Sequence, residues 1–81
     1  MMSPEQSRAA RGWLNWSQED LAKRANVSLS TVRDYEKGRR MPIKNNLDAI
    51  ERAFGVAGMR PLFDGERAVG ISSRDAQRSA S

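Results

Sequence analysis

The sequence predicts an all-α fold of four short helices, followed by a short β-hairpin or strand and a disordered tail. Serines suited to capping helix N-termini precede three of the helical stretches, at Ser3, Ser17 and Ser28. Apolar residues repeat with helical spacing along 47–57. An Asp-Gly dipeptide at 64–65, which is typical of tight hairpin turns, separates two short stretches near the C-terminus. These observations together favour a compact helical domain with a C-terminal hairpin.

The first helix is expected over residues 4–14. Ser3 is a favourable N-cap, Pro4 suits the first helical position, and Gln6 stands where a capping-box partner belongs. Its inward face is weak and holds Ser7, Ala10 and Leu14, with Arg11 alongside. Because Gly12 costs about 1 kcal/mol relative to alanine in a helix, tertiary packing must hold this helix in place.

A second helix over 18–25 and a third over 29–37 are joined by only Asn26-Val27-Ser28. Asn26 can adopt the left-handed conformation that ends a helix, and Gly38 ends the third one. Two hydrophobic staples are expected, one between Trp16 and Leu21 and the other between Val27 and Val32. Ala22 and Ala25 are expected to lie between the two helices, and Tyr35 is expected to face the core. A turn this short makes the helices cross at about 90–120°. The outer side of the third helix then projects as a rod that fits the DNA major groove, which is about 12 Å wide.

The fourth helix is expected to begin near Ile43 or Lys44 and to end at Gly58, or earlier at Gly55. Its apolar stripe comprises Leu47, Ile50, Ala53, Phe54 and Ala57. Ile43 is a poor N-cap. The chain is therefore divided into a helical domain over 1–58, a hairpin over 59–71 and a tail over 72–81.

The hairpin is expected to have strands at 59–63 and 67–71, on either side of Asp64-Gly65. Pro61 has no backbone N–H, which confines its strand to a sheet edge. Residues 72–81 are polar and without large apolar side chains, so this tail is expected to be disordered.

Composition excludes several classes of function. The 81 residues form one small domain and contain neither Cys nor His. Disulfides, thiolate chemistry, histidine acid–base catalysis and the usual zinc, haem and iron–sulfur ligand sets are therefore excluded. We expect no catalytic residues, no metal site and no cofactor, and hence no enzyme. The apolar runs are too short to span a membrane and the N-terminus does not resemble a signal peptide, so a cytoplasmic location is expected.

Basic charge is concentrated in one stretch of the chain. The protein has 14 Lys and Arg residues against 10 Asp and Glu residues, a net charge of +4. Five of the basic residues lie within 33–44, where the acidic residues are only Asp34 and Glu36. A compact basic patch is the electrostatic footprint of a nucleic-acid binder. From charge alone, a solvated loop with incidental charge is an equally good interpretation.

Residues 16–28 and 32–42 resemble the Cro/lambda-repressor-type helix-turn-helix family. The resemblance rests on Ser17-Gln18, Leu21-Ala22, Val27-Ser28 and Glu36-Lys37-Gly38, which stand in the family's register. It covers about residues 4–57 and implies a lambda-repressor-like arrangement of the four helices. The sequence departs from the family at Asn26, where glycine is most common, and at Leu29, where many members carry Gln or Arg.

The resemblance also implies roles for individual residues. The expected base-reading residues are Ser28, Leu29, Ser30, Arg33 and Asp34. The expected phosphate-binding residues are Gln18, Thr31, Lys37, Arg39, Arg40, Lys44 and Asn45. Arg11 and Glu36 resemble a family pair that joins the first helix to the third. Arg33 is the best base reader, because a guanidinium fits guanine O6 and N7 with two parallel hydrogen bonds, while Leu29 suits a thymine methyl. Arg33 can instead pair with Asp34 on a solvated face, and the role of Trp13 stays open between base stacking and packing.

The function that the resemblance implies is sequence-specific binding of double-stranded DNA by a transcriptional regulator. It is expected to be a homodimeric repressor of a promoter, with its own promoter as one option, in a bacterial or phage setting. The homodimer would use the hairpin and read a palindromic operator with half-sites about 34 Å apart. An antitoxin or other interaction module that acts mainly through a partner protein is the alternative. A single-strand or RNA binder is a distant third, because stacking aromatics are expected on a sheet or an open groove.

Overall fold

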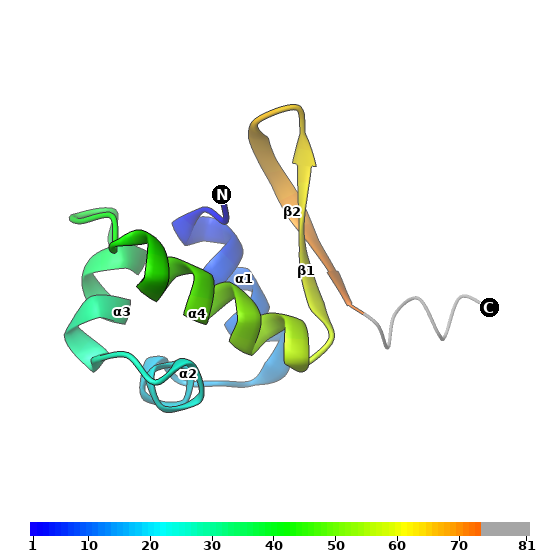
Figure 1. The fold of residues 1–81 in the computed structure, drawn as a ribbon. Coiled ribbons are helices and arrows are strands. Elements are labelled where there is room, and N and C mark those ends of the chain that lie inside the picture. The colour runs from blue at the N-terminus through cyan, green and yellow to red at the C-terminus, as the bar shows by residue number, and fades with distance from the viewer. Residues whose placement is uncertain (74–81) are drawn as a thin grey trace.

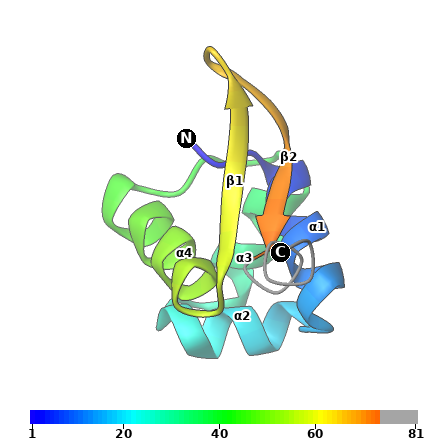
Figure 2. The same ribbon diagram turned by 90° about the vertical axis from the view of Figure 1, so that its right-hand side faces the viewer.

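The computed structural model describes residues 1–73, which form four helices and one two-stranded antiparallel sheet (Figure 1). The elements are α1 (Pro4–Leu14), α2 (Gln18–Ala25), α3 (Leu29–Glu36), α4 (Lys44–Val56), β1 (Met59–Asp64) and β2 (Arg67–Ser73). The helices gather into one body, and the hairpin stands against α1 and α4 and extends beyond them (Figures 1 and 2). The predicted order of four helices and a C-terminal hairpin is confirmed.

The helix N-termini are capped as the sequence predicted. Ser3 accepts a hydrogen bond from the Gln6 N–H, and the Gln6 side chain accepts one from the Ser3 N–H. Ser17 and Asp20 form the same reciprocal box at α2. At the other end of α2, Asn26 is left-handed with φ 58°, and this conformation ends the helix.

Three helix boundaries either differ slightly from the expectation or decide between two expected positions. The third helix ends at Glu36 rather than at Lys37, which is its C-cap, because Gly38 takes a φ of 73° and turns the chain away. The fourth helix begins at Lys44, and Ile43 precedes it without a side-chain cap. It ends at Val56, and Gly58 takes the left-handed conformation beyond it with φ 87°, so Gly55 lies within the helix.

The hairpin turns one residue later than expected, and its second strand is longer. Asp64 pairs with Arg67, so the turn comprises Gly65, with φ 64°, and Glu66. The register slips between Leu62/Phe63, which leaves Val69 as the extra residue of β2. The predicted tail over 72–81 is wrong for Ser72 and Ser73, since the backbone ladder continues to Ser73 opposite Met59. The rest of the predicted disordered tail, 74–81, lies outside the described residues.

The core lies where α2, α3 and α4 meet. Its fully buried side chains include Leu21, Val32, Tyr35, Leu47, Ile50 and Phe54. Trp16 stacks on Phe54 with ring centroids 5.7 Å apart, so its predicted packing role is confirmed. Met2 is also buried, and its backbone carbonyl accepts a hydrogen bond from the Tyr35 hydroxyl. Desolvation by burial, helped by nearby carboxylates, raises the pKa of the Tyr35 phenol well above its usual range.

One buried side chain fixes the hairpin to the helices. Gln6 is only 3% exposed, and its Nε2 donates to the carbonyls of Leu62 and Gly70, each at 2.8 Å. These two carbonyls belong to paired residues on opposite strands. A single amide on α1 therefore holds both strands, and the hairpin has a defined orientation on the helical body.

Candidate nucleic-acid interface

The third helix has one buried side and one exposed side. Val32, Tyr35 and Glu36 face the interior. Ser30 and Arg33 are exposed on the other side. This division leaves Ser30 and Arg33 accessible on the outer side of α3, as base-reading residues in a DNA groove must be.

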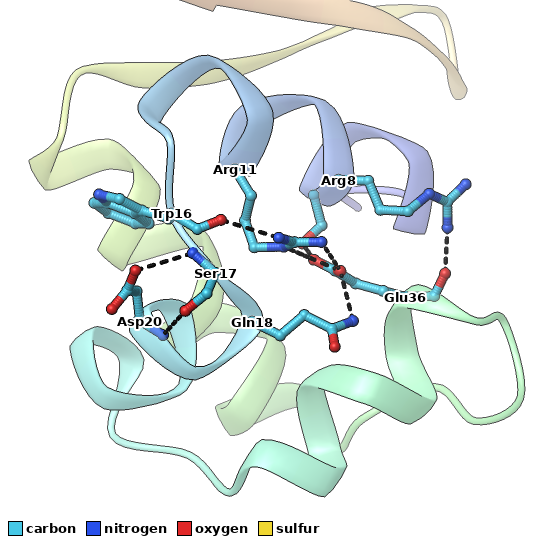
Figure 3. Close-up of polar contacts among 8 residues, drawn as sticks. Arg8, Arg11, Trp16, Ser17, Gln18, Asp20 and Glu36 are labelled. Atoms are coloured by element: carbon cyan, nitrogen blue, oxygen red, sulfur yellow. Dashed lines mark hydrogen bonds and ion pairs between the residues drawn. The ribbon is translucent and has the colours of Figure 1, made fainter.

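Glu36 holds the end of α3 against α1 (Figure 3). The Arg11 Nη2 lies 2.8 Å from Glu36 Oε1, and the Arg11 Nε lies 2.9 and 3.1 Å from the two carboxylate oxygens. The Ser7 hydroxyl donates to Glu36 Oε2 at 2.5 Å. Arg8 donates to the Glu36 main-chain carbonyl at the end of the helix. The expected pair of Arg11 and Glu36 is thus part of a larger contact between the two helices.

Glu36 is charged in spite of its burial. Desolvation raises its pKa, but hydrogen bonds from Arg11, Ser7 and Gln18 outweigh that effect and hold the pKa below its ordinary value. The Glu36 side chain is 1% exposed, and Arg11 neutralises it. The charge of Glu36 therefore does little to lower the positive electrostatic potential around the exposed basic residues nearby.

Gln18 stands at the start of α2, where the resemblance placed a phosphate contact. Its Nε2 donates to Glu36 Oε1 at 3.1 Å, so the side chain is anchored to the last residue of α3 (Figure 3). A carboxamide has two N–H donors. The Glu36 contact fixes the direction of the amide and leaves one donor for a second acceptor.

The five expected base-reading residues are not equally accessible. Ser30 and Arg33 are exposed, whereas Leu29 is half-buried and packs against the core. Asp34 is also half-buried and lines a hollow of about 250 Å³ between α3 and the loop that follows it. The Ser28 hydroxyl caps α3 by accepting from the Thr31 N–H at 3.1 Å. Arg33 and Ser30 are therefore the two expected base readers that are exposed and do not cap the helix, and the Ser30 hydroxyl also contacts the Ser28 hydroxyl at 3.2 Å.

The loop after α3 presents basic side chains beside the helix. The Asp34 carbonyl accepts from the Arg39 N–H at 2.9 Å and from the Arg40 N–H at 3.4 Å, which folds the loop back onto α3. Lys37, Arg39 and Arg40 are all exposed. We call Arg33, Lys37, Arg39 and Arg40 the basic segment.

Two expected phosphate contacts lie at the start of α4, and they differ in their partners. Lys44 pairs with Asp48 at 3.0 Å, an exposed contact one helical turn apart that water screens. Asn45 is exposed. The first turn of α4 thus lies at the far end of the loop that carries the basic segment, and Asn46 lines the same hollow as Asp34.

Sequence reasoning missed three features, of which two lie beside this surface and one at the hairpin. It gave Gln6 only a capping role and gave Arg8 none. It also gave Met41 no surface role and treated Ile43 only as a poor N-cap, whereas these side chains are 57% and 69% exposed near α3. Among residues 1–73, acidic side chains nowhere form a group that could hold a metal ion, and no helix there has the length and apolar character to cross a membrane.

Comparison with known proteins agrees with this geometry. Residues 8–58 match a family model described as "Helix-turn-helix". The chain is 40% identical over 52 residues to Multiprotein-bridging factor 1 of Schizosaccharomyces pombe, which is 64% of this chain and 33% of that protein. It is 44% identical over 46 residues to Multiprotein-bridging factor 1 of Eremothecium gossypii, covering 57% of this chain and 30% of that protein. The chain thus spans about a third of the length of these relatives. Neither relative supports the bacterial or phage setting that we expected, since both are eukaryotic.

Proposed function

The chain belongs to the helix-turn-helix family, of the Cro/lambda-repressor type, and from that premise we propose that it regulates transcription by binding double-stranded DNA through α3. The observation that carries this proposal is the outward, exposed position of Arg33 beside the rest of the basic segment. A planar guanidinium on a protruding helix is the commonest reader of guanine in the major groove. The family, and the names of the relatives, favour a regulatory protein over an enzyme.

The remaining residues have supporting roles in this proposal. Ser30 joins Arg33 in reading bases. The other three expected base readers contact bases only through the atoms that stay accessible: Leu29 and Asp34 are half-buried, and Ser28 caps α3. Phosphates are bound by Gln18, Thr31, Lys37, Arg39, Arg40, Lys44 and Asn45. Gln18 is well suited to this task, because its Glu36 contact fixes the amide at a helix N-terminus that favours an anion.

Arg33→Ala is expected to weaken binding to the preferred DNA site by about 1–3 kcal/mol and to relax selection at one base position. Arg33→Lys keeps the positive charge but loses the bidentate guanidinium donor, so we expect it to lose the same selectivity at that base position. Selection from random duplex DNA defines the site, and titrations of that site and of random DNA then measure both variants. An equal loss on both DNAs, for Arg33→Ala, would contradict base reading.

Arg39→Ala and Arg40→Ala are expected to weaken binding to every DNA sequence alike. Each lost phosphate contact should reduce the slope of log affinity against log salt by about one unit. Lys23→Ala is the matched control, because Lys23 is exposed on α2 and pairs with Glu19 on the same helix. A salt slope that stays constant in both arginine variants would show that neither side chain binds phosphate.

We further propose that the protein acts as a homodimer and represses by covering promoter DNA. The hairpin exposes Leu62, Phe63 and Val69, at 41%, 38% and 52%. A hollow of about 540 Å³ lies beside it, between the start of α4 and β1, and Phe63, Leu47 and Pro61 are among its apolar lining residues. A second copy that covers these side chains would place two α3 helices on half-sites of a palindromic operator.

A protein-interaction module is the second candidate function. Its support is the name of the relatives, which describes proteins that bridge several others. In that case DNA contact would be secondary, and Arg33→Ala would leave the regulatory output in cells unchanged. A reporter assay with this variant distinguishes the two functions.

A further inference from the structure

A groove of about 550 Å³ lies between α2 and α4, and none of the residues assigned to DNA lines it. Its lining residues come from the connection before α2, the end of α2 and the C-terminal half of α4: Trp16, Arg24, Ala25, Asn26, Ala49, Arg52, Ala53, Val56 and Ala57. The Trp16 ring and the Gln18 amide point in opposite directions from the start of α2 (Figure 3). The groove therefore opens on a different side of α2 from the proposed DNA contact.

The floor of the groove is apolar and made of small residues. Ala25 and Ala53 are buried, and Trp16 lies beside them on the Phe54 ring. Val56 is 81% exposed at the edge. The small alanine side chains on α2 and α4 leave room for apolar side chains of a partner. Trp16 and Val56 supply apolar surface against which those partner side chains can pack.

Two arginines flank this apolar floor, and neither of them forms an ion pair among residues 1–73. The Arg24 guanidinium carbon lies 4.4 Å from the Trp16 ring centroid, so a cation–π contact holds it at the edge of the groove. The Asp20 carboxylate, one turn earlier, accepts from the Ser17 N–H; this contact, more than the charge of the nearby Arg24, lowers the Asp20 pKa. Asp48, one turn before Arg52, pairs with Lys44. Within residues 1–73, neither Arg24 nor Arg52 forms an ion pair, and no acidic residue lines the groove.

We propose that this groove binds an acidic, amphipathic segment of a partner protein. Apolar side chains of that segment cover Trp16, Ala53 and Val56, and its carboxylates pair with Arg24 and Arg52. A volume of about 550 Å³ accommodates the few anchoring side chains of one helical face, which is a common mode of peptide recognition. The apolar floor favours a peptide over nucleic acid, because a phosphate backbone gains nothing from covering alanine and valine.

Trp16 provides a direct readout of binding. The chain has two tryptophans, and Trp13 is 59% exposed on α1, so Trp13→Phe leaves Trp16 as the only one. The probe is a synthetic 16-residue peptide of Glu, Leu and Ala, with leucines on one helical face. The same peptide with Lys in place of Glu serves as the charge control. We expect a saturable change in Trp16 fluorescence with the Glu peptide and no such change with the Lys peptide.

Arg24→Gln/Arg52→Gln is expected to weaken the Glu-peptide affinity at least tenfold. The matched control is Lys23→Gln/Arg67→Gln, which removes the same charge from two exposed residues outside the groove and should change that affinity less than twofold. Retained chemical-shift dispersion in an amide NMR spectrum shows that each variant folds.

Three results would overturn the proposal: no response to the Glu peptide, equal responses to the Glu and Lys peptides, or equal losses in the two double variants. The DNA salt slope of Arg24→Gln/Arg52→Gln is expected to stay unchanged. A slope lower by about two units would assign these arginines to phosphates and would also overturn the proposal. An equal loss on preferred and random DNA in Arg33→Ala contradicts only the proposed DNA function, so the failures of the two proposals are distinguishable.

Discussion

Replacing Glu36 with alanine is expected to lower the free energy of unfolding by about 3–5 kcal/mol, which is the cost of removing one partner from a buried charge pair. A domain of this size has a total stability on the order of 4–12 kcal/mol, so the variant should be largely unfolded at moderate urea. The lost carboxylate is 1% exposed and receives hydrogen bonds from α1 and α2. Its removal leaves the donors of Arg11, Ser7 and Gln18 without their acceptor.

Urea unfolding followed by circular dichroism measures this effect. Glu19→Ala is the matched control, because Glu19 is 64% exposed and lies 3.5 Å from Lys23 in an i,i+4 pair. Such a surface pair contributes about 0.3–0.5 kcal/mol. A loss below about 1 kcal/mol for Glu36→Ala would show that the network does not hold α3 against α1.

Acidification should reproduce part of this loss in the unaltered protein. The pKa of Glu36 is lower in the folded than in the unfolded chain, so its contribution is fully present above the unfolded value of 4.5. The contribution then declines as the pH falls through the folded pKa. Stability measured against pH should therefore fall less steeply below pH about 4.5 in Glu36→Ala than in the unaltered protein.

Local features of the fold were predictable from the sequence because their causes lie within four residues. The capping boxes of Ser3 with Gln6 and of Ser17 with Asp20 each close over three residues. The left-handed Asn26 likewise ends its own helix. The hairpin end was not predictable this way, because Ser73 belongs to β2 through pairing with Met59, and its polar side chain carries no sign of that ladder.

The candidate site was predictable in outline, and its supporting contacts were not. Arg33 is exposed on α3, where helical spacing from the buried Val32 and Glu36 places it. Leu29 at the start of the same helix is half-buried, since it packs on the core. Gln18 is held by a residue 18 positions away along the chain. Contacts over such separations depend on how the helices cross, which local patterns do not specify.

Phe63→Glu is expected to dissociate the proposed homodimer and to weaken binding to a DNA site with two half-sites by about 10²–10⁴-fold. Phe63 is part of the exposed apolar surface of the hairpin and lines the hollow beside α4. A carboxylate there must lose its water when a second copy covers it. Asp48 and Glu51 line the same hollow, where Lys44 already pairs with Asp48. Without the second copy, each α3 binds alone and the gain from linking two contacts disappears.

Sedimentation measures the dimer, and titrations with one and with two half-sites measure the DNA effect. Val56→Glu is the matched control, because it adds the same charge to an exposed apolar residue that does not line the hollow beside Phe63. Binding to a single half-site should be equal in both variants, since the charge change is the same and α3 is intact. A dimer that persists in Phe63→Glu would exclude the hairpin as its interface. If the unaltered chain sediments as a monomer, the proposed homodimer and its palindromic operator are wrong. Base reading by Arg33 is then still tested separately by Arg33→Ala.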